Sequence, residues 1–357
     1  MQVGKRQVEE LARRAAAHVE AFYLWRVIEP APDGCPLVLT FDGKGIVMLP
    51  DALRPATAKA AAAAGGKLAT RLSPGEKNGR KRMAELACVY DAVPAPRTPE
   101  EVISTPAQKL PKKKAQAARP KGRGKPREPR ARGKWLTASV TDDIPAVIAA
   151  AFGEAERRDP GHDREWVVLI DGNNAQIEAV TAEAARRGVK VMIVIDFVHV
   201  LEYLWKAAWS FFDKGEPAAE AWVAAQARKV LHGKSAQVAA GIRRRATTYR
   251  YSPAERVGAD ECARYLRNKE NYLGYATALK KGWPIATGVI EGACRHIVKD
   301  RMDITGARWG LEGAEAILKL RAMIASGDLE DYWPFHLRRE HERIHHTKYR
   351  DSHVLAA

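Results

Sequence analysis

The chain has few cysteines, and none is placed for metal binding or cross-linking. Four cysteines stand among 357 residues, at positions 35, 88, 262 and 294. None forms a C-x-x-C pair, so neither a zinc ribbon nor a disulfide framework is expected. The cysteines therefore indicate a protein of a reducing compartment.

Long apolar runs are also missing. No stretch of about 18 apolar residues occurs, which is the minimum for a membrane-spanning helix. The first residues, Met1 to Arg6, lack the apolar core of a signal peptide. We therefore expect a cytoplasmic protein with no membrane partner.

Acidic residues are scarce relative to basic ones. The chain holds 59 Lys and Arg against 43 Asp and Glu, a net charge of +16. Such an excess is typical of proteins that contact nucleic acid. Because 46% of the residues are hydrophobic, the chain can still build a substantial core.

One segment carries most of this excess charge. Residues 108–134 contain twelve Lys or Arg, four Pro and one acid, so they carry +11 of the total. Such a composition buries too little apolar surface to fold. We predict a disordered arm or linker over residues 106–134 whose bases contact the DNA backbone. Those named as DNA contacts are Lys112, Lys113, Lys114, Arg119, Lys121 and Arg123.

Three acidic residues stand where regular structure would position them. Asp42 lies in an Asp-Gly-Lys-Gly stretch between two β-rich runs, a pattern that predicts a hairpin over 36–49. Asp171 directly follows residues 165–170, which are apolar from Trp166 onward, as is typical of a buried central strand. Glu291 lies in the first turn of a basic helix that begins near Ile290. Asp42 could equally be a turn residue, and Glu291 could pair with Arg295 at i,i+4.

Periodicity predicts the remaining elements. Strands are expected over residues 82–93 and 189–195. Helices are expected over residues 5–25, 143–158, 175–187, 201–212, 218–232, 236–248, 259–279 and 311–324.

Without the basic segment and the helical block over 201–281, the order of elements is that of an RNase H-like core. In that fold the acids lie on the first strand, the fourth strand and a late helix. Carboxylates suit phosphodiester chemistry because two Mg²⁺ ions roughly 3.5–4 Å apart stabilise both the attacking and the leaving oxygen. Mg²⁺ keeps several waters, so few protein ligands suffice. We predict an α/β protein with an RNase H-like mixed-sheet core and an all-α insertion before the last catalytic helix.

This interpretation divides the chain into seven parts. They are an N-terminal helical segment (1–35), the first part of the core with three strands (36–105), the basic arm (106–134), the second part of the core (135–200), the all-α insertion (201–281), the last part of the core with the Glu291 helix (282–327) and a basic, His-rich tail (328–357).

Four stretches carry a family resemblance: residues 40–48 (TFDGKGIVM), 170–172 (IDG), 196–205 (DFVHVLEYLW) and 282–292 (GWPIATGVIEG), the last continuing through 303–309 (DITGARW). They resemble the Kra-type bacterial insertion-sequence transposases, which are DDE transposases related to the Mutator-like group. The similarity runs from about Arg6 to Arg350. The last stretch is its most specific part.

The resemblance implies a transposase of the bacterial, nucleoid-associated cytoplasm that cleaves and transfers DNA strands at insertion-sequence ends. It implies Asp42, Asp171 and Glu291 as catalytic and metal-binding residues, with two Mg²⁺ or Mn²⁺ ions. It makes Asp196 and His199 an accessory DxxH element. The expected partner is double-stranded DNA, both transposon ends and target, on which the chain would form a homo-oligomer. We expect Arg295, Lys299 and Arg301, which follow Glu291, to contact its phosphates.

Several alternatives stay open. Asp196 also ends a buried strand and could be the second acid, although the family places that acid upstream of the DxxH element. Glu202 could be the third acid. Asp196 and His199 could instead be a buried pair that braces the insertion, which we favour over a metal site. The His-rich tail is expected to be solvated.

Two other functions are compatible with the same residues. One is a non-catalytic DNA-binding relic of a transposase, and the other is an RNase H-like nuclease. Only 41 residues precede Asp42, and they hold no zinc motif, whereas such transposases usually carry a DNA-recognition region there. A truncated copy would retain catalytic geometry and lose recognition of the transposon ends.

Overall fold

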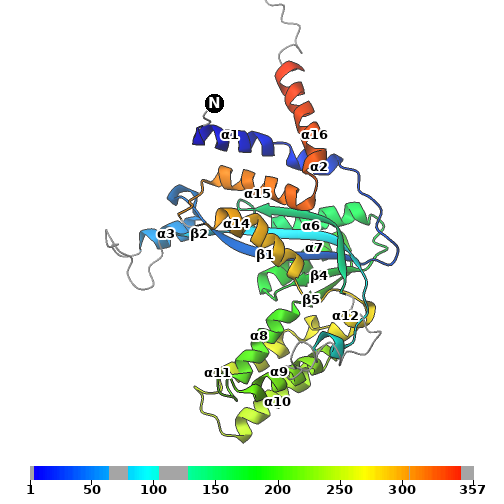
Figure 1. The fold of residues 1–357 in the computed structure, drawn as a ribbon, viewed down its shortest axis with the longest axis vertical. Helices are drawn as coiled ribbons and strands as arrows, with labels where there is room; N and C mark the ends of the chain where they lie inside the picture. The colour runs from blue at the N-terminus through cyan, green and yellow to red at the C-terminus, as the bar shows by residue number, and fades with distance from the viewer. Residues whose placement is uncertain (1–3, 64–78, 104–127, 305, 347–357) are drawn as a thin grey trace, which may run out of the picture.

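The protein is built on a five-stranded mixed sheet (Figure 1). The computed structural model describes residues 4–63, 79–103, 128–304 and 306–346. The strands are β1 (Leu37–Val47), β2 (Lys81–Val93), β3 (Arg130–Ser139), β4 (Trp166–Ile170) and β5 (Val191–Ile195). Their order is β3-β2-β1-β4-β5, with β1, β4 and β5 parallel and with β2 antiparallel to both of its neighbours. This arrangement is consistent with an RNase H-like topology, as predicted.

β1 is one continuous strand, so the predicted hairpin at Asp42–Gly45 is wrong. β1 pairs with β2 over its whole length, from Leu37 opposite Asp91 to Val47 opposite Lys81. Gly43 and Gly45 permit this because a Cβ there would lie 3.0 Å and 2.9 Å from β2 side chains. The glycines therefore allow close packing between strands and do not form a turn.

The third strand is β3, which begins inside the segment predicted to be a disordered arm. Residues 82–93 form a strand as expected, but it is the second one. Arg130, Ala131 and Arg132 pair with the end of β2. Basic residues fit this position because β3 is an edge strand of the sheet, where their charged ends can reach water. Residues 106–127 of the predicted arm lie outside the described residues.

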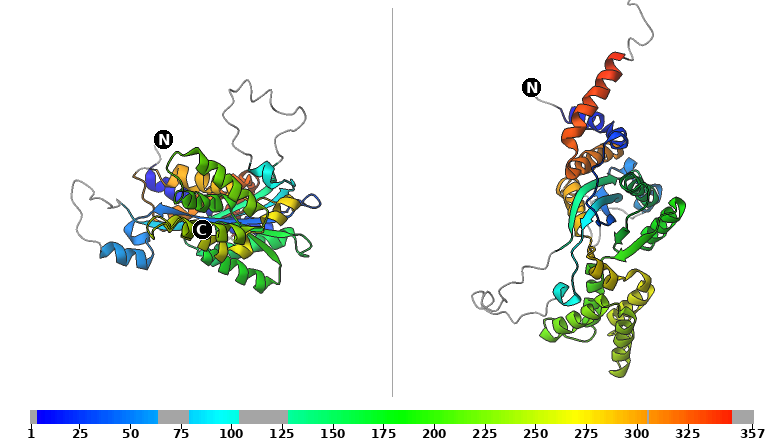
Figure 2. Two further views of the ribbon diagram at one scale, coloured as in Figure 1. Left: turned by 90° about the horizontal axis from the view of Figure 1, so that it is seen from below. Right: turned by 90° about the vertical axis from the view of Figure 1, so that its right-hand side faces the viewer.

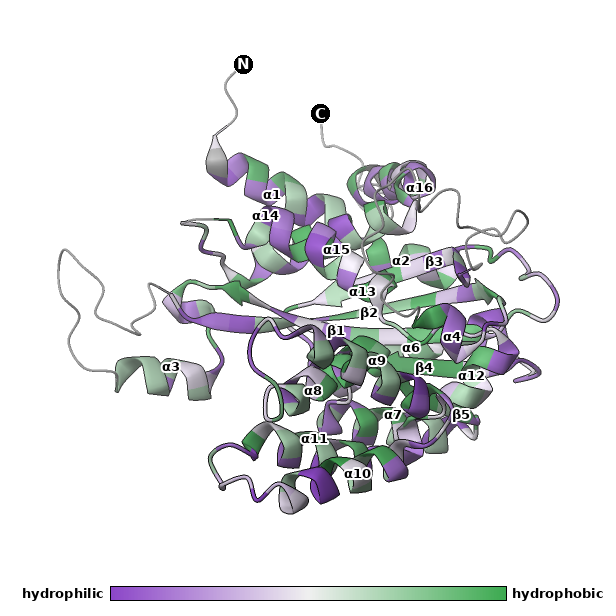
Figure 3. Ribbon diagram, turned by 60° about the horizontal axis from the view of Figure 1, so that its bottom comes forward, coloured by the Kyte–Doolittle hydropathy of each residue, from purple (hydrophilic) through white to green (hydrophobic). Residues whose placement is uncertain are grey.

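Helices cover both faces of the sheet (Figures 1 and 2). The predicted helices α6 (Ile144–Arg158) and α7 (Asn174–Arg187) are present and pack on the face that carries Leu37, Leu39 and Phe41. The opposite face packs against α13 (Gly288–Ala293) and α15 (Leu311–Ser326). β4 lies between these layers and is buried throughout, which explains its uniform hydrophobicity (Figure 3).

A block of helices follows β5 and extends from one end of the sheet (Figure 1). It confirms the helical prediction for residues 201–281, although the predicted helix over 259–279 is two helices. The apolar residues of the block and those of the α13 face of the sheet form one continuous core. The block contains α8 (Phe197–Ala208), α9 (Pro217–Leu231), α10 (Ser235–Thr248), α11 (Val257–Asn268), the short turn η2 (Glu270–Tyr272) and α12 (Tyr275–Lys281).

The two ends of the described chain pack together at the opposite end of the molecule (Figure 1). The predicted helix over 5–25 is two helices, α1 (Lys5–Ala16) and α2 (Val19–Trp25). The tail is also more ordered than predicted, because α16 (Leu329–His341) and the π-helical segment Glu342–His346 follow α15. Phe22 of α2 packs edge-on against Tyr332 and Phe335 of α16, which explains why this part of the tail folds.

Short helices occupy several of the connections. They are η1 (Pro50–Ala52), α3 (Pro55–Ala62), α4 (Pro99–Val102) and α14 (Asp300–Met302). No helix within the described ranges has the length and apolar character needed to cross a membrane. All four cysteines are buried and free, which agrees with the prediction that none forms a disulfide.

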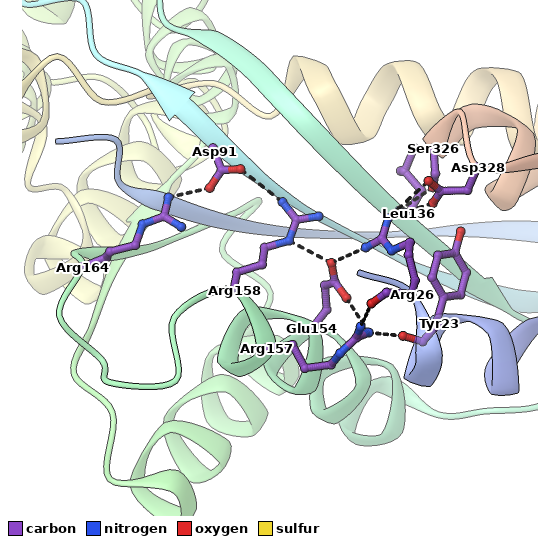
Figure 4. A network of polar contacts seen from close by, with 10 residues as sticks. All are labelled: Tyr23, Arg26, Asp91, Leu136, Glu154, Arg157, Arg158, Arg164, Ser326 and Asp328. Carbon is purple, nitrogen blue, oxygen red and sulfur yellow. Dashed lines mark hydrogen bonds and ion pairs between the residues drawn. The ribbon is translucent and has the colours of Figure 1, made fainter. Parts of the chain in front are cut away.

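A network of buried charges joins the N-terminal helices to the sheet (Figure 4). Glu154 of α6, whose side chain is only 2% exposed, accepts hydrogen bonds from Arg26, Arg157 and Arg158. Arg158 also pairs with Asp91 of β2. The network thus holds α2 and α6 together and ties α6 to β2 of the sheet.

Candidate active site

Asp42, Asp171 and Asp196 lie in a row across the three parallel strands, with Asp42 within β1 and with Asp171 and Asp196 just after the ends of β4 and β5. Thr40 of β1 pairs with Leu169 of β4. Two residues further along this register, Asp42 stands level with Asp171. Asp196 follows the pair Ile170–Ile195, and its backbone N–H donates to the Ile170 carbonyl at 2.7 Å. Neighbouring strands lie about 4.8 Å apart, so the row is compact.

Asp42 and Asp171 also point to the same face of the sheet. Side chains alternate along a strand, and Val38 and Ile46, which share the parity of Asp42, face the α13 core. Val167 and Leu169 do the same in β4 and set the direction of Asp171. The structure therefore brings these two predicted acids together on one face.

The loop after β4 holds Asp171 in a fixed conformation. Asp171 Oδ1 accepts a hydrogen bond from the backbone N–H of Asn173 at 2.8 Å. Gly172 has φ +95°, and a Cβ at this position would meet the Tyr265 hydroxyl at 3.1 Å. A residue without a side chain is needed here for both reasons. The Asn173 side chain then caps α7.

Glu291 reaches the same face from α13. Ile290 and Ala293 are buried against the sheet, which fixes the orientation of the helix. The chain continues directly into a π-helical segment, Cys294–Lys299. Such segments are uncommon and occur frequently at functional sites. The Glu291 side chain stays exposed, so its carboxylate can meet a ligand from solvent.

Thr287 links Glu291 to the end of β5. Its buried hydroxyl lies 2.9 Å from Glu291 Oε1 and also contacts Asp196 Oδ2. Asp196 is fully buried, and its other oxygen caps α8 by accepting from the Val198 N–H at 2.8 Å. The sequence analysis did not identify Thr287, although its position four residues before Glu291 places both on one side of the helix.

Cys294 contacts the site on the side of Asp42. Burial raises the pKa of the Cys294 thiol, and the nearby Asp42 carboxylate, which hydrogen-bonds the thiol, raises it further. The thiol therefore stays protonated and can donate to Asp42. Nothing in the sequence indicated that Cys294 lies beside Asp42. Thr287, Glu291 and Cys294, at i, i+4 and i+7, span the row of acids from Asp196 to Asp42.

The helical block contributes a lysine and a tyrosine beside Asp171. Lys269 is buried and donates to the Asn174 side chain. Burial lowers the pKa of Lys269, while the charge of Asp171 opposes that change. Tyr265, one turn earlier, stacks on Tyr203 with ring centroids 3.8 Å apart. These residues went unnoticed in the sequence because only the folded chain places α11 against the loop after β4.

The predicted buried pair of Asp196 and His199 is not formed. Asp196 bonds to Thr287, whereas His199 is partly exposed and its Nδ1 lies 3.2 Å from Glu202 Oε2. The two residues diverge because Asp196 caps α8 and His199 stands on the first turn of that helix. Glu202, the rival third acid, is 61% exposed on α8 and pairs with His199.

Basic residues line the helix that follows Glu291. Arg295 and Lys299 are exposed, and Arg295 lies 3.9 Å from Asp300. Arg301 is exposed as well and stacks over Trp309 at 5.5 Å. The structure thus places all three predicted phosphate contacts on the surface of the helical segment that follows Glu291. The six named bases of the arm lie outside the described residues.

The donor chemistry of the site suits a hard cation, although the carboxylates are not gathered into a complete set of ligands. Within the described residues, no three His, Cys, Asp or Glu side chains are placed together so that they could hold a metal ion. Asp42, Asp171 and Glu291 supply only oxygen donors, which Mg²⁺ and Mn²⁺ prefer. A cation there would complete its coordination with water or substrate.

Comparison of the chain with models of known protein families, with curated proteins and with solved structures finds no match. The function is therefore argued from the geometry of the site.

Proposed function

We propose that the protein is a DDE-type transposase that cleaves DNA at insertion-sequence ends and transfers the freed strand to target DNA. The observation that carries this proposal is the level placement of Asp42 and Asp171 on neighbouring parallel strands, with the Glu291 helix packed over the same face. This is the arrangement of acids expected of an RNase H-like catalytic core. The helices between β5 and α13 would then be an insertion in that core.

In this proposal Asp42, Asp171 and Glu291 hold two Mg²⁺ or Mn²⁺ ions. When bound, such ions stabilise the attacking and leaving oxygens of a phosphodiester displacement. The chain itself holds and orients the acids: Gly43 N–H donates to Asp42 at 2.7 Å, and Asn173 N–H donates to Asp171. The exposed bases after Glu291 bind DNA phosphates and place the strand over the acids.

The test is metal-dependent cleavage of labelled DNA. The substrate is a duplex that carries the candidate terminal repeats flanking the gene, and the control is a scrambled duplex of equal length. We expect nicking at the repeat boundary with Mg²⁺ or Mn²⁺ and none with EDTA. In a parallel measurement without DNA, Mn²⁺ should raise the Tm of the protein because it binds only the folded state.

The alternatives give other results. Cleavage of both duplexes at scattered positions would identify an RNase H-like nuclease. DNA binding without cleavage, and with no effect of Mn²⁺ on Tm, would identify a DNA-binding relic and contradict the proposal.

The basic segment supports a second prediction. Residues 108–127 carry nine Lys or Arg and no acid. Replacing these nine by Ser at constant length should weaken binding to every duplex alike and flatten its salt dependence. The slope of log K against log salt should fall by about 0.9 for each phosphate that the segment no longer neutralises. Residues from Arg130 onward are left intact because they belong to β3.

The measurement is binding of both proteins to the repeat duplex and to the scrambled duplex over a series of salt concentrations. A variant with the same segment in shuffled order keeps the charge and serves as control. Equal salt slopes for the wild type and the Ser variant would show that the segment is only a linker. Loss of preference for the repeat duplex would show that it reads sequence.

A further inference from the structure

We infer that Thr287 is a positioning residue, whose buried hydroxyl fixes the Glu291 carboxylate against Asp196 and so sets where a metal ion can bind. This inference rests on the proposed function, since it concerns the third acid of the same site. It assigns Asp196 a supporting role at the end of β5. Thr287 itself touches neither DNA nor metal in this assignment.

The Thr287 hydroxyl does not cap its helix but contacts two carboxylates. Thr287 is the N-cap residue of α13, a position where Thr ordinarily accepts a hydrogen bond from an N–H of the first turn. Its side chain makes no such cap. The hydroxyl lies instead between Glu291 and Asp196, at 2.9 Å from Glu291. The helix thus lacks this cap, and the hydroxyl holds a carboxylate instead.

Backbone hydrogen bonds fix the segment that carries Thr287. The Thr287 carbonyl accepts from the N–H groups of Ile290 at 2.9 Å and Glu291 at 3.1 Å. The Phe197 N–H, next to Asp196, donates to the Ile285 carbonyl at 2.8 Å. The segment Ile285 to Thr287 is therefore tied both to the Glu291 helix and to the start of α8. An exposed Glu side chain has many rotamers, and this contact selects one of them.

A single hydroxyl of Thr287 lies between two carboxylates. A hydroxyl carries one proton, so Thr287 can donate to only one carboxylate at a time. The second carboxylate then faces an oxygen lone pair of the hydroxyl, an unfavourable contact that a cation beside Glu291 would relieve. The arrangement is therefore suited to a site whose metal ion arrives from solvent on the exposed side of Glu291.

The test compares Thr287→Val and Thr287→Ala, which remove the hydroxyl, with Thr287→Ser, which keeps it. The control is Thr181→Val on α7, where the hydroxyl of an exposed Thr donates to the Ile177 carbonyl at 2.8 Å. For each protein we would measure Mn²⁺ affinity by calorimetry without DNA, the cleavage rate over a range of Mg²⁺ concentrations, and Tm.

We expect the Val and Ala variants to need about tenfold more Mg²⁺ or Mn²⁺ and to lose about 10- to 100-fold in kcat, the usual cost of removing a group that orients a metal ligand. KM for DNA should not change, because Thr287 does not contact the substrate. The Ser variant and Thr181→Val should stay within about threefold of the wild type. If Thr287→Val lowers Tm, the effect of losing the hydroxyl is judged from Thr287→Ala, since Ala lacks the γ-methyl group that Val adds beside the carboxylates.

Two results would overturn the inference while leaving the proposed function in place. One is a Val and an Ala variant that bind Mn²⁺ and cleave DNA like the wild type. The other is a Ser variant as defective as these two, since the hydroxyl would then not be the cause. A wild-type protein that binds no Mn²⁺ and cleaves no DNA would overturn the proposed function, and the inference with it.

Discussion

Replacement of Asp171 by Asn should lower the rate of Mg²⁺-dependent cleavage by about 10³-fold and leave the fold intact. The substitution removes one of the charges proposed to hold the cations, and loss of an electrostatic group at a reacting centre costs on this scale. Asn keeps the oxygen that accepts from the Asn173 N–H. Stability should therefore change by less than about 1 kcal/mol. Asp42→Asn and Glu291→Gln should behave in the same way.

The control for this experiment is Glu202→Gln. Glu202 is the other acid considered for the third position, and it stands exposed on α8 beside His199. We expect its variant to cleave within about threefold of the wild type, since its charge is screened by water. If Glu202→Gln lost as much of the cleavage rate as Asp171→Asn while Glu291→Gln cleaved normally, Glu202 and not Glu291 would be the third acid. Rates would be measured under single-turnover conditions, with Tm recorded for each variant.

The central part of the fold was predictable because its signals are strong and local. β4 is apolar at every position, and α7 between β4 and β5 has a matching helical period. A strand buried on both faces cannot be polar on either, so the residues of β4 themselves reveal its environment. The same reasoning located Asp171 at the edge of the sheet. The positions of Asp171 and Asp196 thus follow from where buried strands end, whereas Asp42 lies within β1, which continues to Val47.

The full length of β1 and the start of β3 were not predictable, for the opposite reason. Asp42-Gly43 is a strong local turn signal, yet pairing with β2 overrides it over the whole length of β1. β3 begins with Arg130 and Arg132, whose charges resemble those of the preceding basic segment. An edge strand tolerates them because its outer side faces water. Composition alone could not separate the strand from the segment before it.

The residues that support the site were missed because packing, and not spacing, gives them their partners. Lys269 comes next to Asp171 only because α11 folds back onto the loop after β4. Cys294 is an ordinary apolar position of a helix until Asp42 is placed opposite to it. Thr287 could have been noticed as a Thr one turn before the acid. Its contact with Asp196 depends on the meeting of two distant segments.

Replacement of Glu154 by Ala should destabilise the protein by about 3–5 kcal/mol, the cost of leaving buried charges without their partner. Glu154 is 2% exposed, and it accepts from Arg26 at 2.7 Å and from Arg158 at 2.8 Å (Figure 4). Arg158 is itself only 5% exposed, so water cannot replace the missing carboxylate. Arg26 would keep its ion pair with Asp328 at 3.0 Å, which limits the loss of stability at Arg26.

The matched control for Glu154→Ala is Glu312→Ala, which breaks an ion pair between distant parts of the chain at the surface. Glu312 of α15 lies 2.8 Å from Arg13 of α1, with 77% of the Glu side chain exposed. Exposed pairs contribute at most about 1 kcal/mol, because water and salt screen them. Urea unfolding of both variants, with the slope m compared to that of the wild type, separates the two cases. The order of the two losses should persist at high salt, since a buried network is screened much less than a surface pair. Equal and small losses would mean that Arg26 and Arg158 find other partners, and that the network does not hold α2 and α6 to the sheet.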